Sequence, residues 1–138
     1  MLRSVVAVVA GFVVITAVVI AFTFALSALL YPGRPMDAPV EPSATWLVLN
    51  LVYSLMAALV GGWVAAWIAN RSPFAHAVAL AVLLAVVTLA GSIGGGEPAA
   101  PSGGPAWYPY LVALLGILGV LLGGRLAIPA GKGPGPDR

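Results

Sequence analysis

The sequence predicts an all-α integral membrane protein, a four-helix bundle of transmembrane helices with both termini in the cytoplasm (N-in/C-in). Hydrophobic residues make up 62% of the 138 residues and charged residues only 7%, whereas an average soluble domain carries about 25% charged residues. A soluble fold of this length keeps much of its surface in water, so it could not hide so many apolar side chains. The solvent that remains for them is lipid.

Four apolar runs support this prediction. A helix needs about 20 apolar residues to cross a bilayer core of about 30 Å, and each run reaches that length without any Asp, Glu or Lys. The runs extend over residues 4–30, 44–70, 73–92 and 106–127. We therefore expect one transmembrane domain over residues 1–127 with short loops, and a disordered cytoplasmic tail over the Gly- and Pro-rich residues 128–138.

The first run directly follows Met1-Leu2-Arg3, so it could be read as a signal peptide. Its apolar stretch is much longer than the ~7–15 residues of a signal-peptide core. We therefore expect it to stay in the membrane as a helix. It ends before the Pro-rich residues 32–42, through which no helix can continue.

The second and third runs carry start signals of helices. Ser43 is placed to cap the second helix and Ser72 the third, because a serine hydroxyl can accept a hydrogen bond from an amide of the first turn. Pro73 suits the first position of the third helix, where its missing N–H costs nothing. The Gly-rich residues 94–104 then predict an external loop before the fourth run.

The basic residues predict the orientation of the chain, because Lys and Arg favour cytoplasmic loops close to the ends of the spans. With four spans, the N-terminus, the second loop and the C-terminus share one side of the membrane. That side holds all of the six basic residues except Arg34. They are Arg3, Arg71, Arg125, Lys132 and Arg138.

Aromatic residues are expected to mark the two membrane boundaries, since amphipathic rings favour the headgroup level. The outer group consists of Tyr31, Trp46, Trp107, Tyr108 and Tyr110. Trp67 and Phe74 mark the inner boundary. Trp63 lies deeper, so it either packs within the bundle or faces lipid.

Small residues at helical spacing predict where the helices approach closely. Apolar side chains gain little by leaving lipid for one another, so close backbone contact must hold such a bundle together. The strongest series lie in the second and fourth runs and comprise Ala57, Gly61, Ala65, Ala69, Gly119 and Gly123. They either pack inside one bundle or form a dimerisation face. The first run has a similar series in Ala17, Ala21 and Ala25, and we expect some small-residue surface to remain for a partner.

Asn50, Tyr53 and Ser54 form a polar patch in the second run. Residues three and four apart share one face of a helix. The patch could line a small outward-facing cavity. Alternatively, it could form hydrogen bonds with Thr23 or Ser27 of the first run, which lie in the same half of the membrane.

His76 is the only histidine and lies one turn into the third helix. It could be the single ligand of a pigment or of a haem iron. It could also respond to pH, because histidine is the side chain that titrates at about pH 5–8. The third interpretation is an interfacial histidine that contacts headgroups or water.

The spans lack the residues on which most membrane chemistry depends. A coupled transporter usually needs a carboxylate inside the membrane, and a hydrolase needs a Ser, His and Asp constellation or a metal site. The chain also has no cysteine. We therefore expect no catalytic residue, no metal site and no cofactor.

Further features are distinctive in combination. The chain opens with Leu2-Arg3-Ser4 before a Val/Ala-rich run that contains Gly11. Residues 61–69 read GGWVAAWIA, residues 105–110 read PAWYPY and residues 122–126 read LGGRL. In these segments the chain resembles a diffuse group of small, uncharacterised bacterial membrane proteins with four transmembrane helices. The resemblance implies a place in the bacterial cytoplasmic (inner) membrane and brings no assigned activity.

We expect a non-enzymatic accessory or structural subunit, which associates through small-residue helix faces with copies of itself or with a larger membrane protein complex. The alternative is a passive channel or small-molecule carrier built from several copies, with Asn50, Tyr53 and Ser54 facing the pore. The partner implied by composition is the lipid bilayer, whereas six basic residues are too sparse for nucleic acid.

Overall fold

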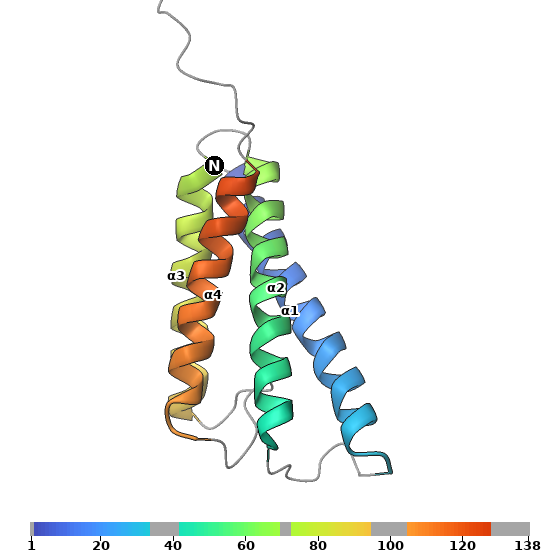
Figure 1. Cartoon of the computed structure of the whole chain (residues 1–138). Helices are drawn as coiled ribbons and strands as arrows, with labels where there is room; N and C mark the ends of the chain where they lie inside the picture. The colour runs from blue at the N-terminus through green and yellow to red at the C-terminus, as the bar shows by residue number, and fades with distance from the viewer. Residues whose placement is uncertain (1, 34–41, 70–72, 95–104, 128–138) are drawn as a thin grey trace, which may run out of the picture.

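The structure, a computed structural model, describes residues 2–33, 42–69, 73–94 and 105–127, and these residues form a bundle of four helices (Figure 1). Each helix is long and apolar enough to span a membrane. The described residues contain no strand. The helices are α1 (Leu2–Leu30), α2 (Ala44–Ala69), α3 (Pro73–Gly94) and α4 (Tyr108–Leu126). The predicted all-α, four-helix fold is confirmed, and the predicted spans differ from the helices by at most two residues at each end.

Several sequence predictions fall outside the described residues. They concern the turn at residues 70–72, most of the Gly-rich loop before α4, and the tail over residues 128–138. Of the two predicted serine caps, the one at Ser43 is confirmed. Its hydroxyl oxygen accepts a hydrogen bond from the backbone N–H of Trp46 at 3.2 Å, which satisfies one of the amides that a helix start leaves without a partner.

The helices run alternately up and down, so the start of α1, the end of α2, the start of α3 and the end of α4 meet at one end of the bundle (Figure 1). We call this the N-terminal end, and the opposite one the far end. α2 is the central element and packs against the other three helices, while α3 also packs closely on α4. α1 and α4 make no direct contact within the described part of the chain.

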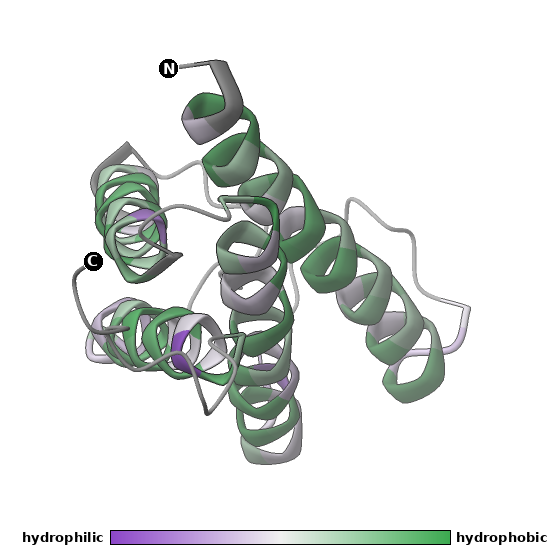
Figure 2. Cartoon of the chain, turned by 90° about the horizontal axis from the view of Figure 1, so that it is seen from above, coloured by the Kyte–Doolittle hydropathy of each residue, from purple (hydrophilic) through white to green (hydrophobic). Residues whose placement is uncertain are grey.

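α1 leaves the bundle as it runs toward the far end (Figure 1). Its buried residues, Ala7, Gly11 and Ile15, all lie in its first half. Only 17% of the residues in its most apolar window are buried, compared with 44% in α2. Seen from above, α1 crosses α2 at an angle while α3 and α4 lie beside α2 (Figure 2). The second half of α1 therefore has most of its surface outside the bundle.

Glycines set the distances between the helices. An added Cβ at Gly11 of α1 would lie 2.9 Å from the carbonyl oxygen of Gly61 in α2, and a Cβ at Gly61 would lie 2.9 Å from that of Gly11. On the other side of α2, a Cβ at Gly62 would collide with the backbone of Val120 in α4. These approaches bring backbone against backbone, which is how helices associate where lipid removes the usual hydrophobic driving force.

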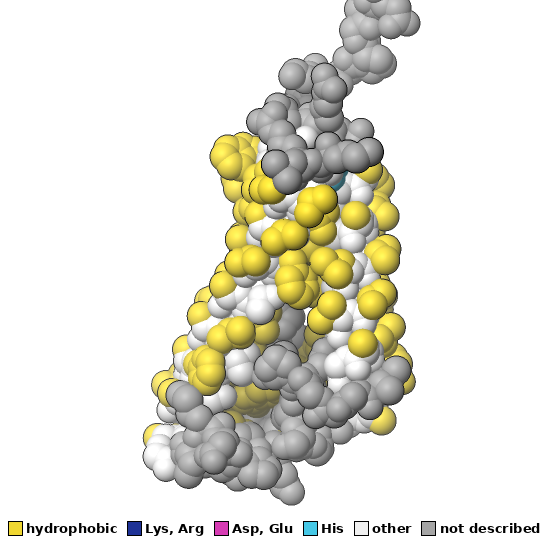
Figure 3. All heavy atoms as spheres, turned by 180° about the vertical axis from the view of Figure 1, so that it is seen from behind, with side chains coloured by type: hydrophobic (Ala, Val, Ile, Leu, Met, Phe, Trp, Pro, Cys, Tyr) yellow, Lys and Arg dark blue, Asp and Glu magenta, His cyan; other side chains and the backbone are white. Residues whose placement is uncertain are grey.

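Most large apolar side chains lie on the outside of the bundle, and small side chains make up most of its interior. Figure 3 shows that hydrophobic side chains cover the described surface along the length of the bundle. The main buried cluster, by contrast, consists mainly of alanines together with Ile15, Leu80 and Val120. The aromatic rings of Trp46, Tyr53 and Tyr108 are also buried. A helix that is apolar all round is typical of a membrane span, so this distribution agrees with lipid as the solvent of the bundle.

Candidate functional site

The predicted polar patch lies at the centre of a largely buried hydrogen-bonded group, which we call the polar cluster and which consists of Thr23, Asn50, Tyr53, Ser54 and Tyr108. The side chain of Asn50, only 1% exposed, is its hub. The Asn50 amide donates to the hydroxyl of Tyr53, and its carbonyl oxygen accepts from the hydroxyl of Tyr108. The hydroxyl of Ser54 also donates to that oxygen, at 3.5 Å.

The cluster joins three helices. Tyr53 and Thr23 lie 2.6 Å apart, oxygen to oxygen, which links α2 to α1. Because the Tyr53 oxygen already accepts from Asn50, its own proton is available for Thr23. The ring of Tyr53 also stacks on Phe22 of α1, with 5.7 Å between the ring centres. Tyr108 completes the link to α4. Each polar group of the patch is thus used in contacts between or within helices.

Of the two interpretations of the patch, this geometry matches hydrogen bonding to the first helix, with Thr23 as the partner of Tyr53. Sequence reasoning missed Tyr108, which was assigned to the outer aromatic belt. Tyr108 is only 2% exposed and bonds to Asn50 instead. The positions of the two residues along their helices could have indicated this contact. Tyr108 begins α4 and Asn50 lies two turns into α2, so both are near the same end of the bundle.

Trp46, also assigned to the outer belt, is buried and lies one turn before Asn50 on α2. Its indole N–H has no hydrogen-bond partner among the described residues. A buried donor of this kind normally finds a partner, and its desolvation costs free energy when it does not. Trp63 and Trp67, in contrast, are exposed and stack on each other with 6.2 Å between ring centres. Trp63 is therefore a surface residue and not a core one.

The predicted packing residues all lie inside the bundle. Ala57, Gly61, Ala65, Ala69, Gly119 and Gly123 are all buried. They contact other helices of the same chain; for example, a Cβ at Gly123 would collide with the backbone of Leu59. These six residues are therefore not available to a second chain. The alanine series of α1 behaves differently, because Ala17, Ala21 and Ala25 are exposed.

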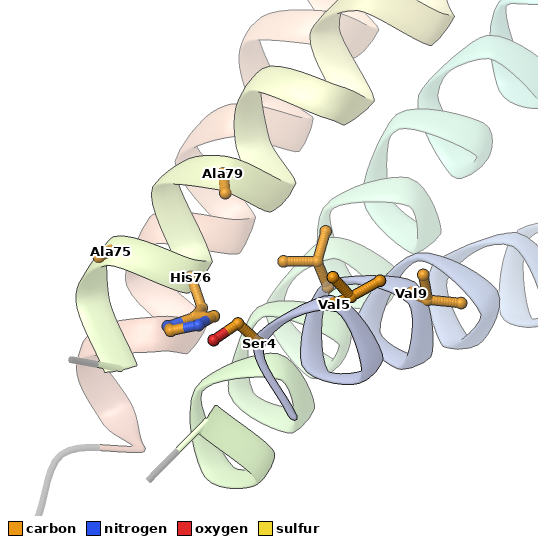
Figure 4. Close-up of a pocket in the computed structure, with 7 residues that line it drawn as sticks. Ser4, Val5, Val9, Ala75, His76 and Ala79 are labelled. Atoms are coloured by element: carbon orange, nitrogen blue, oxygen red, sulfur yellow. The ribbon is translucent and has the colours of Figure 1, made fainter. Parts of the chain in front are cut away.

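His76 lies at a groove between the first turns of α1 and α3, which we call the N-terminal groove. The groove has a volume of about 400 Å³. Its lining residues are Ser4, Val5, Val8, Val9, Ala75, His76 and Ala79. Figure 4 shows the hydroxyl of Ser4 and the imidazole of His76 pointing toward one another across the gap between the two helices. The rest of the lining is valine and alanine, so the groove is open and its surface is almost wholly apolar.

A cation lies at the same end of the bundle. The guanidinium of Arg125, in the last turn of α4, lies 5.6 Å from the centre of the Phe74 ring. Phe74 precedes His76 by two residues in the first turn of α3. Within the described part of the chain, no group of three or more His, Cys, Asp or Glu residues could hold a metal ion.

Comparisons of the chain with protein-family models, with curated proteins and with solved structures found no significant match.

Proposed function

We propose that this chain is a non-enzymatic accessory or structural subunit of the bacterial inner membrane, with both termini in the cytoplasm, and that it binds a helix of another membrane protein through the second half of α1. The observation that supports this proposal is the exposed series of Ala17, Ala21 and Ala25 on the helix that leaves the bundle.

The outward-facing small residues of α1 favour a partner helix over lipid alone. The other strong small-residue series of the chain are used in packing within the bundle, as Gly61 on Gly11 illustrates. The series on α1 is the one that faces outward. In lipid, small residues are valuable at a surface because they let a second backbone approach closely.

The channel alternative draws less support from the contacts. Its premise was that Asn50, Tyr53 and Ser54 face a pore. In the described residues, Asn50 and Tyr53 are bonded across helix contacts and Ser54 is bonded to Asn50. Opening a pore lined by these groups would require breaking the contacts between α1, α2 and α4.

The absence of cysteine from the sequence permits a direct test. Ala21→Cys places a unique thiol on the exposed face of α1, and Val52→Cys places one on the exposed face of α2 as a matched control. Both are expressed in native membranes, labelled with a maleimide that carries a photoreactive group, and irradiated, so that the thiol can be joined to a neighbouring chain whether or not that chain contains cysteine. We expect Ala21→Cys to yield a cross-linked species of defined mass and Val52→Cys to yield none.

The mass of that species identifies the partner, because a doubled mass means a second copy and any other mass means a different protein. A bulky variant, Ala25→Phe, should abolish cross-linking from Ala21→Cys without altering the helix content. Equal cross-linking from both thiols, or none from Ala21→Cys at native expression level, would contradict the proposed role of α1.

A further inference from the structure

We propose that the tilt of α1 adjusts to the thickness of the surrounding bilayer. The close contact of Gly11 with Gly61 is the pivot of this movement, and the hydrogen bond between Thr23 and Tyr53 restrains it. This inference rests on the four helices lying in a bilayer. It concerns the chain by itself, so it does not depend on a partner at the second half of α1.

The apolar spans of the bundle differ in length. That of α1 comprises 27 residues and that of α4 only 19. At about 1.5 Å per residue, these lengths are about 40 Å and about 28 Å, while the hydrocarbon core of a bilayer is about 30 Å thick. α4 therefore fits the core upright, whereas α1 matches it only at a tilt of about 40°. α1 is indeed inclined to the other three helices (Figure 1, Figure 2).

α2 is nearly as long as α1, but it cannot tilt by itself because it packs against the other three helices. Its exposed Trp67 is suited to the headgroup level, so the surplus length of α2 can extend beyond the hydrocarbon core. The last turns of α1, in contrast, hold Phe24 and Leu29, which are exposed apolar side chains and are costly to move out of hydrocarbon. Tilting keeps them inside.

The contacts of α1 permit a change of tilt. Its buried residues are Ala7, Gly11 and Ile15, and Val18 and Val19 pack against the buried cluster from outside. Beyond Val19, no residue of the helix is buried. α1 is thus fixed to the bundle through its first half, while the second half has most of its surface available to lipid.

Tyr53 of α2 restrains this second half. Its hydroxyl oxygen lies 2.6 Å from that of Thr23, and its ring stacks on Phe22. A single hydrogen bond between helices in lipid is weak, and a mismatch of a few ångströms between helix and bilayer costs a comparable free energy. A modest change of bilayer thickness is therefore sufficient to move α1 away from this position.

The size of the movement follows from the helix length. Natural bilayers range in core thickness from about 27 Å to about 33 Å, and over this range the matching tilt of a 40 Å span falls from about 48° to about 35°. From the pivot at Gly11 to Ala28, the helix is about 25 Å long. The change of tilt therefore carries Ala28 about 4 Å closer to α4 in the thicker bilayer.

The test measures this distance in the full chain. Because the sequence has no cysteine, Ala28→Cys with Tyr110→Cys places two spin labels at exposed positions near the far end of α1 and α4. The protein is placed at low density in phosphatidylcholine vesicles of short or long acyl chains, and the distance is measured by pulsed electron paramagnetic resonance. We expect it to shorten by about 4 Å as the core thickens from about 27 Å to about 33 Å. A constant or a longer distance would overturn the proposal.

A matched pair of labels controls for general deformation of the bundle. Val52→Cys with Tyr110→Cys joins exposed positions of α2 and α4, two helices whose backbones meet at Gly62 and Val120. This distance should be the same in both bilayers. If it shortens as much as the distance from Ala28 does, the whole bundle deforms and α1 is not the adjustable element.

Two variants at Thr23 test the restraint. Thr23→Val removes the hydroxyl that bonds to Tyr53 and keeps the shape of the side chain, so the distance from Ala28 to Tyr110 should change more with thickness than in the native chain. Thr23→Ser keeps the hydroxyl and should respond like the native chain. Equal responses of the two variants would refute the restraining role of this bond. Circular dichroism and gel filtration of each variant confirm that the labelled protein is folded.

Discussion

Removal of the Asn50 side chain should be the most informative change in the polar cluster. Asn50→Leu keeps the approximate volume but deletes both the donor to Tyr53 and the acceptor of Tyr108 and Ser54. Hydrogen bonds between helices in lipid contribute about 0.6 kcal/mol on average and up to about 1.7 kcal/mol. The loss of a hydrogen-bond partner by buried hydroxyls adds to the cost. We expect Asn50→Leu to lower the free energy of unfolding by about 2 kcal/mol.

A double-mutant cycle with Tyr108→Phe checks the mechanism. In the native background, Tyr108→Phe removes one bond and should cost about 0.6 kcal/mol. In the Asn50→Leu background, the bond from Tyr108 to Asn50 is already absent, so removal of the Tyr108 hydroxyl should cost less than it does in the native background. The assay is equilibrium unfolding in mixed micelles of a mild and a denaturing detergent. If the two losses simply add, the two residues are not coupled and the described network is wrong.

Two further predictions use the same assay. Gly123→Ala places a methyl group against the backbone of Leu59, which no rotamer change can relieve, so it should cost about 1–3 kcal/mol. The matched change Gly116→Ala meets only the flexible side chain of Leu84 and should be neutral or stabilise by up to about 1 kcal/mol through helix propensity; equal losses in both would refute this account of helix contact. Trp46→Phe deletes a buried N–H that has no partner among the described residues but also leaves a small cavity, so its cost should stay below about 2 kcal/mol, and a larger loss would mean that the indole has an acceptor.

The sequence predicted the four helices well because length and apolar content alone decide whether a segment can cross a bilayer. The ends of the helices could also be located from the sequence. Ser43 caps α2 as expected, and the prolines and glycines separate the spans. These are local properties, which depend on few neighbours in the chain.

The faces of the helices were harder to predict. In a soluble protein, apolar side chains mark the face that turns inward, but a span in lipid is apolar all round and loses that signal. Small residues were the remaining guide. They predicted the close approach of Gly61 and Gly123 to other helices, yet the similar series at Ala17, Ala21 and Ala25 faces outward because α1 makes its contacts through Ala7, Gly11 and Ile15.

The polar cluster shows the same limit of prediction from the sequence. Asn50, Tyr53 and Ser54 were recognised because polar groups are rare in these spans and share one face. Tyr108 was not, since a tyrosine at the start of a span is ordinarily an interfacial residue. Its burial depends on the close contact of α2 with α4, which brings the start of one helix beside the second turn of the other. That juxtaposition is a tertiary property.

The departure of α1 from the bundle also affects the membrane itself. α1 separates from the other three helices toward the far end (Figure 1), so the described part of the bundle is wedge-shaped and wider at that end. A wedge occupies more area in one leaflet than in the other, and the surrounding lipids must adjust to that difference. We expect such a molecule to concentrate where the bilayer is already curved in the matching sense, and to impose a slight bend when many copies gather.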